Sequence, residues 1–91
     1  MDSINKIKEK VESTLRHISL AALPHGAQAR VVGIEGSGAG KVRLMEMRVV
    51  PGASISVVRA APLGDPLQIC LRNYHLALRR VDADKITVLI A

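Results

Sequence analysis

The chain is poor in aromatic residues and cysteine: its 91 residues include no tryptophan or phenylalanine, one tyrosine and one cysteine. A single cysteine excludes an internal disulfide, and we expect a cytoplasmic location. The core must therefore consist of Val, Ile, Leu, Ala and Met, which favours a small, tightly closed sheet over a large sandwich. Binding of single-stranded nucleic acid is also disfavoured, because such proteins stack bases on aromatic side chains and Tyr74 is the only aromatic residue here.

Long hydrophobic runs and concentrated charge are absent as well. The sequence has no stretch of about eighteen uncharged apolar residues, so we expect no membrane-spanning helix. Acidic residues among the lysines of residues 1–17 argue against a signal peptide. The net charge of +5 is spread over both halves of the chain. It permits nucleic acid or anionic lipid as partners but requires neither.

Residues that commonly carry out catalysis do not occur in a catalytic pattern. Ser54 and Ser56 have no His and Asp at a spacing that would activate them, and Cys70 has no evident base. The glycine-rich residues 36–40 are followed by Lys41, as in phosphate-binding loops, but the next residue is valine, where the Walker pattern requires Ser or Thr. We therefore expect residues 36–40 to form a flexible surface turn. Because no catalytic set is found, we also expect that the protein is not an enzyme.

The N-terminal segment has the periodicity of an amphipathic helix. From Ser3 to His17, apolar residues recur at steps of three and four, which places them in one stripe. They are Ile4, Ile7, Val11, Leu15 and Ile18. We assign residues 1–18 to this helical extension and residues 19–91 to a compact domain. The stripe is expected to pack on the domain or on a second copy of the chain, which would form a homo-oligomer.

The compact domain contains short runs of alternating apolar and polar residues, typical of strands. We expect strands at residues 29–34, 54–60, 67–72, 75–79 and 86–90. Two short helices are expected, at residues 41–47 and 81–84. The first would cover the open end of a barrel, with Val42, Leu44 and Met45 facing the core. The predicted fold class is mainly β: a small five-stranded SH3-like barrel with a short helix and an N-terminal amphipathic helix.

Three turns connect the expected strands and helices. Residues 50–53 have Pro-Gly at their centre, which is typical of a type II turn because proline fixes φ and glycine accepts positive φ. Asn73 and Tyr74 are expected to be the two turn residues of a hairpin, since asparagine tolerates left-handed backbone. Residues 61–66, Ala-Pro-Leu-Gly-Asp-Pro, form a rigid corner because each proline fixes its own φ and biases its predecessor toward extended geometry.

These turns and the residues after them resemble the FeoA family. The matching residues are Pro51-Gly52, the corner of residues 61–66, Leu76-Ala77-Leu78-Arg79-Arg80, Ala83 and Ile86. The resemblance extends from about Ile18 to Ile90. It implies a small cytosolic SH3-like protein that accompanies FeoB, the GTP-hydrolysing membrane transporter of bacterial ferrous iron uptake. Related domains are fused behind the DNA-binding and dimerisation domains of metal-dependent repressors.

Three features depart from the pattern of the family. The family usually has glycine where Arg48 stands, so the short helix is expected to end differently here. It also usually has glycine where Asn73 stands, a conservative change because both residues accept positive φ. The N-terminal helix is additional.

Four residues are the candidates for binding a partner: Leu63 and Asp65 in the corner, and Arg79 and Arg80 in the Leu-Arg-Arg segment. Asp65 is expected either to accept backbone N–H bonds that hold the corner or to contact the partner. The two arginines are expected either to pair with the acidic residues that follow them or to dock on an acidic partner surface.

Metal binding is a weaker expectation, with Cys70 and His75 as candidates. If Asn73 and Tyr74 form the turn, Cys70 and His75 lie diagonally across the hairpin. Two ligands are too few for a structural metal site. We therefore expect no required cofactor and only weak binding of divalent transition metal.

Together, the resemblance and the lack of a catalytic set predict a non-enzymatic accessory protein of bacterial ferrous iron transport. Its partner would be the cytosolic part of the FeoB transporter, which would recruit it to the inner face of the membrane. The alternative is a free-standing metal-sensing or regulatory domain related to the C-terminal SH3-like domain of metal-dependent repressors.

Overall fold

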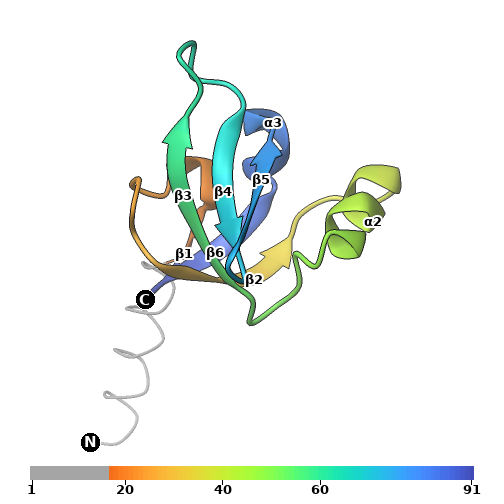
Figure 1. The fold of residues 1–91 in the computed structure, drawn as a ribbon. Helices are drawn as coiled ribbons and strands as arrows, with labels where there is room; N and C mark the ends of the chain where they lie inside the picture. Colours follow the sequence, from red (N-terminus) through yellow and green to blue (C-terminus); the bar gives the residue numbers. More distant parts are fainter. Residues whose placement is uncertain (1–16) are drawn as a thin grey trace, which may run out of the picture.

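The computed structural model describes residues 17–91, whose arrangement is shown in Figure 1. The helix expected over residues 1–18 lies outside the described residues, except for its last two positions. His17 and Ile18 belong to a strand, so this end of the helix prediction is wrong. Within residues 17–91, no helix combines the length and apolar character needed to cross a membrane.

The described part of the chain forms six strands and three short helical segments. In chain order these are β1 (His17–Ser19), the 3-10 turn η1 (Leu20–Ala22), β2 (Ala29–Ile34), α2 (Ala39–Glu46), β3 (Ser54–Ala60), β4 (Leu67–Leu71), β5 (Tyr74–Leu78), α3 (Arg80–Ala83) and β6 (Ile86–Ile90).

The six strands form one antiparallel sheet in the order β1-β6-β2-β3-β4-β5. The mainly β prediction is confirmed, but the number of strands is six instead of five. The additional strand is β1, which pairs Ile18 with Val88 of β6. In residues 17–91 the end strands β1 and β5 do not pair with each other. The sheet is therefore open, and the prediction of a closed barrel is wrong.

The core lies on the inward face of the sheet and is aliphatic. β4 shows how the sequence produces it: Leu67, Ile69 and Leu71 are at most 1 % exposed, while Gln68 and Cys70 between them are partly exposed. Successive side chains of a strand point to opposite faces, so a period of two places all three aliphatic residues in the core. Full burial of each such side chain contributes about 1.5–3 kcal/mol relative to an exposed position.

Helix α2 projects from the side of the sheet (Figure 1) instead of covering the end of a barrel. Of its three expected core residues, Leu44 is buried, whereas Val42 and Met45 are 53 % and 48 % exposed. The apolar spacing of α2 therefore predicted more buried side chains than the structure has.

The C-terminus of α2 has the hydrogen bonds of a Schellman motif. The Val49 N–H donates to the Leu44 carbonyl, and the Arg48 N–H donates to the Met45 carbonyl, each over 3.0 Å. This motif needs a left-handed residue after the helix, usually glycine. Arg48 occupies that position with φ 74°. The expectation of a different helix end is wrong, because arginine adopts the conformation that glycine favours.

The β4–β5 hairpin turns one residue earlier than predicted. Leu71 pairs with Tyr74, so the turn residues are Arg72 and Asn73, with φ of 48° and 74°. Positive φ at both central residues is typical of a type I′ turn, whose twist fits antiparallel strands. The left-handed conformation of Asn73 is confirmed, and the assignment of Tyr74 to the turn is wrong.

The turn over residues 50–53 forms as predicted. The Ala53 N–H donates to the Val50 carbonyl over 3.0 Å, and Gly52 has φ 89°. This turn brings the chain from α2 into β3, whose Ile55 and Val57 enter the core.

Candidate partner-binding surface

Residues 61–66, called the corner loop below, join β3 to β4 and protrude from the sheet (Figure 1). The Ala61 N–H donates to the Pro66 carbonyl over 2.9 Å, and the Gly64 N–H donates to the Ala61 carbonyl over 2.7 Å. Its own hydrogen bonds thus hold the loop in addition to its prolines. Leu63 is 97 % exposed. A stiff loop therefore presents an aliphatic side chain to solvent, where burial by a partner would be favourable.

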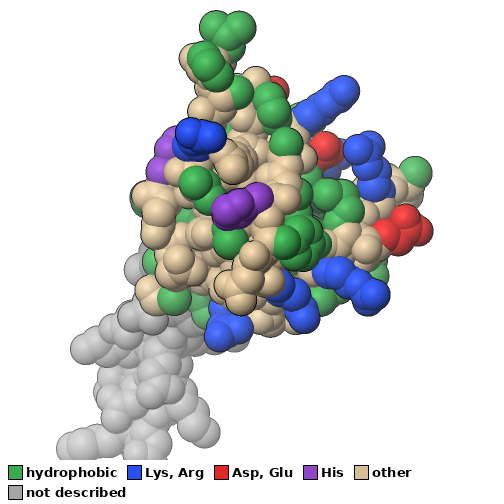
Figure 2. All heavy atoms as spheres, viewed as in Figure 1, with side chains coloured by type: hydrophobic (Ala, Val, Ile, Leu, Met, Phe, Trp, Pro, Cys, Tyr) green, Lys and Arg blue, Asp and Glu red, His purple; other side chains and the backbone are tan. Residues whose placement is uncertain are grey.

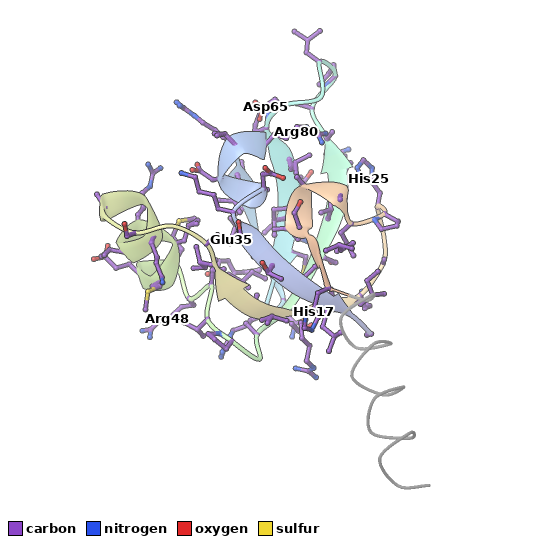
Figure 3. All side chains as sticks on the ribbon, turned by 180° about the vertical axis from the view of Figure 1, so that it is seen from behind. His17, His25, Glu35, Arg48, Asp65 and Arg80 are labelled. Carbon is purple, nitrogen blue, oxygen red and sulfur yellow. The ribbon has the colours of Figure 1, made fainter. Side chains whose placement is uncertain are left out.

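Asp65 links the corner loop to α3. Its Oδ1 accepts a hydrogen bond from the Arg80 N–H over 2.9 Å, and Figure 3 shows the two residues close together. Arg80 begins α3, and the preceding Arg79 makes no side-chain capping bond. Asp65 therefore satisfies a backbone donor that the helix leaves unpaired. One of the two expectations for Asp65 is that it accepts backbone N–H bonds that hold the corner. Asp65 does accept a backbone N–H bond, but the donor belongs to α3 and not to the loop.

The Arg80 side chain connects three segments. Its Nε donates to the Gly64 carbonyl over 3.1 Å, and its Nη1 donates to the Ala21 carbonyl over 3.5 Å. Gly64 lies in the corner loop and Ala21 in η1, which contacts α3. Since η1 follows β1 and α3 follows β5, this contact joins the two ends of the open sheet. Arg80 is therefore engaged within the molecule.

A groove of about 430 Å³ separates α2 from β5 and α3; we call it the strand–helix groove. It is lined by Gly40, Arg43, Leu44, Met47, Pro66, Ala77, Leu78, Arg79, Val81 and Asp82. Arg43 and Arg79 bring two exposed cations to it from opposite sides. Figure 2 shows Lys and Arg side chains on this side of the molecule, around α2 and α3, with Asp and Glu side chains among them. Sequence reasoning identified Arg79 but missed Arg43.

A larger groove of about 750 Å³ lies between the corner loop and the outer face of β4 and β5. Its lining includes Pro62 and Pro66 of the loop, Gln68 of β4, and His75 and Ala77 of β5. The Arg59 Nε donates to the Gln68 Oε1 over 2.7 Å, which fixes one wall. Because Ala77 lines both grooves, β5 lies between them.

Cys70 and His75 are directly opposite in the β4–β5 register. Their predicted diagonal arrangement is wrong, because the turn comes one residue earlier. Opposed residues of an antiparallel pair have Cβ atoms about 4.5–5.5 Å apart, so the two side chains are well placed to share one ion. In the part of the chain from residue 17 onward, however, no three His, Cys, Asp or Glu side chains are grouped to hold a metal ion.

Comparison with known proteins identifies a related protein that contains a transporter. The Fe(2+) transport protein A/Fe(2+) transporter FeoB fusion protein of Porphyromonas gingivalis (strain ATCC BAA-308 / W83) is 45 % identical to this chain over 69 residues. The match covers 76 % of this chain and 8 % of that protein. The chain thus spans only a small part of the relative's length.

Solved structures share the fold. FeoA from Chlorobium tepidum is 38 % identical, with a TM-score of 0.74 over 80 % of this chain and 70 % of that one. The zinc complex of Stenotrophomonas maltophilia FeoA, a prokaryotic SH3 domain protein, is 28 % identical, with a TM-score of 0.68 over 78 % and 88 %. IdeR from T. acidophilum, at 16 % identity and a TM-score of 0.69 over 82 % and 34 %, shares the fold alone.

The neighbours confirm the SH3-like fold, here as an open sheet of six strands. The family model of the FeoA domain matches residues 18–89. The matched segment includes the corner loop, both grooves and the Leu-Arg-Arg segment. The chain therefore belongs to the FeoA domain family.

Proposed function

We propose that this protein is an accessory of ferrous iron transport that binds the cytosolic part of a FeoB transporter and performs no chemistry itself. One observation carries the proposal: a relative joins a domain like this one to a FeoB transporter in a single chain. Fusion keeps two domains at high effective concentration. A separate chain would come equally close to the transporter by binding its cytosolic part at the inner face of the membrane.

The proposed contact surface consists of the corner loop and the strand–helix groove. Leu63 would supply apolar contact, while Arg43 and Arg79 would supply charge. The net charge of +5 favours an acidic partner surface and would speed the encounter. Asp65 and Arg80 act indirectly in this proposal, by holding the corner loop and α3 in position.

Iron uptake by cells is the first test. Cells that lack this protein should take up less Fe²⁺ through FeoB, and the wild-type gene should restore uptake. A Leu63→Asp/Arg79→Glu double variant should restore little. The matched control is Lys85→Glu, which reverses an exposed charge after α3 that lines neither groove. This control should restore uptake fully.

A pull-down from the same cells gives the direct readout. Tagged wild-type protein and the Lys85→Glu variant should recover FeoB, and the double variant should not. Unchanged iron uptake without the protein, together with no recovery of FeoB, would overturn the proposal.

A metal-sensing or regulatory domain is the alternative, and the fold shared with IdeR is the observation that favours it. At 16 % identity this likeness concerns the fold alone. Recovery of a DNA-binding regulator in place of FeoB would move the proposal to this alternative.

Weak binding of a divalent transition metal by Cys70 and His75 is a separate proposal, supported by their opposed positions. Calorimetric titration with Zn²⁺ should show weak binding by the wild type, since only two protein ligands are available. The Cys70→Ser/His75→Ala variant should show less. Equal binding by both proteins would place any metal elsewhere.

A further inference from the structure

The outer edge of β5 has no pairing strand within residues 17–91. β5 is the last strand of the sheet and pairs only with β4. The unpaired N–H and C=O groups of such an edge are a template on which another chain can add a strand. Proline and bulges commonly protect exposed edges. β5 contains no proline, and its register with β4 has no irregularity.

The register indicates which backbone groups of β5 point outward. In a two-residue hairpin the pair that closes the turn, here Leu71 and Tyr74, is hydrogen bonded, and such pairs alternate along the ladder. His75 and Ala77 therefore direct their N–H and C=O groups away from β4, and Leu76 directs its groups toward β4. Both outward residues are exposed. In the described residues, no turn or loop hydrogen bond uses their backbone groups.

The strand–helix groove lies beside the C-terminal end of this edge, at Ala77 and Leu78, whereas His75 lines the larger groove. Ala77 belongs to one wall and α2 forms the other. The Tyr74 hydroxyl donates to the Met47 carbonyl over 2.7 Å, which ties β5 to the end of α2. A strand bound along this edge would find backbone partners on β5. Its continuation into the groove would meet α2, with Arg43 and Arg79 on either side.

We propose that an extended acidic segment of the partner binds along the outer edge of β5 as an additional strand and continues into the strand–helix groove. Main-chain hydrogen bonds to His75 and Ala77 would provide affinity. Arg43 and Arg79 would select Asp or Glu through charge-assisted bonds. A second copy of this chain is a poorer occupant, because it carries a net charge of +5 and like charges repel. We infer this on the basis of the proposed function, with FeoB as the partner.

Amide hydrogen exchange followed by NMR tests the inference. The labelled full chain is compared alone and with an excess of the cytosolic part of FeoB. The amides of His75 and Ala77 should exchange rapidly in the free protein and at least about tenfold more slowly in the complex, because the added strand would protect them. The Leu76 amide is an internal control, since its bond to β4 should keep its exchange slow in both states.

Two variants test the contact independently. His75→Pro removes an outward N–H, and proline is tolerated at edge positions of this kind, so the variant should fold and lose binding. Arg43→Glu/Arg79→Glu reverses the groove charge and should weaken binding about tenfold or more. Lys85→Glu is the charge control and should bind as the wild type does. Thermal unfolding followed by circular dichroism checks the fold of each variant.

Alternating protection of His75 and Ala77, with binding weakened by Arg43→Glu/Arg79→Glu, would support strand addition even if His75→Pro failed to fold. Binding of the FeoB part without that protection would overturn the inference and leave the proposed function standing. Absence of any binding would overturn both.

Discussion

Arg79 and Arg80 are neighbours in the sequence but belong to two regions that use their polar groups differently. At the junction of the corner loop, η1 and α3, Arg80 donates hydrogen bonds to two backbone carbonyls and to Asp65. In the strand–helix groove, Arg79 is exposed beside an open strand edge. The first region makes its hydrogen bonds within the fold. The second region leaves backbone N–H groups of β5 and the positive charge of Arg79 available to a partner. Two residues of the same type therefore have different roles because they occupy different positions in the fold.

Arg80→Ala should have the largest effect on stability. It removes two hydrogen bonds from a charged side chain, and such bonds contribute about 1.5–3 kcal/mol each. Because Arg80 is exposed and one bond is 3.5 Å long, we expect a total loss of only about 1–2 kcal/mol. Urea unfolding measures this loss, with Arg79→Ala as the control, expected to stay within about 0.5 kcal/mol of the wild type. Equal losses in both variants would contradict the distinction between the two regions.

Asp65→Ala should destabilise the same junction by about 1 kcal/mol, the usual effect of losing a side-chain acceptor at a helix start. Asp65→Asn keeps an oxygen acceptor at this position and should lose less. The free energy of unfolding of both variants, measured in urea, gives the comparison. An Asp65→Ala variant as stable as the wild type would show that α3 does not depend on this bond.

Arg48→Gly should stabilise the fold by about 0.5–1 kcal/mol, because it relieves the left-handed conformation of a residue with a Cβ atom. Arg48→Ala is the control, since alanine removes the charge and keeps the strain. Thermal unfolding should therefore rank glycine above alanine, and the reverse order would contradict this explanation. Because Arg48 follows α2, which forms one wall of the strand–helix groove, the affinity of Arg48→Gly for the partner also tests whether stabilising this helix end leaves binding unchanged.

Much of the sheet was predictable from the sequence because its strands have a period of two over several residues, as in Leu67, Ile69 and Leu71. β1 was missed for two reasons. Three residues are too few to show alternation, and Ile18 continued the helical spacing of the preceding segment. The hairpin was placed one residue late because Asn73 is a common left-handed residue and Arg72 is not.

The candidate site was predictable only in part. The prolines marked the corner loop, and the Leu-Arg-Arg segment drew attention to Arg79 and Arg80. Their separate roles depend on contacts between segments far apart in the chain, such as Arg80 with Ala21. Arg43 was missed for the same reason, since the packing of α2 beside β5 leaves no local pattern in the sequence.

The most direct test of the proposed function is to measure how tightly the cytosolic part of FeoB binds three proteins. These are the wild type, Arg79→Glu and Lys85→Glu, and the quantity compared is the dissociation constant. We predict measurable binding by the wild type and about tenfold weaker binding by Arg79→Glu, equivalent to about 1.4 kcal/mol. Lys85→Glu should bind within about twofold of the wild type, because it lies outside both grooves. No binding by the wild type, or equal binding by all three proteins, would contradict the proposed contact.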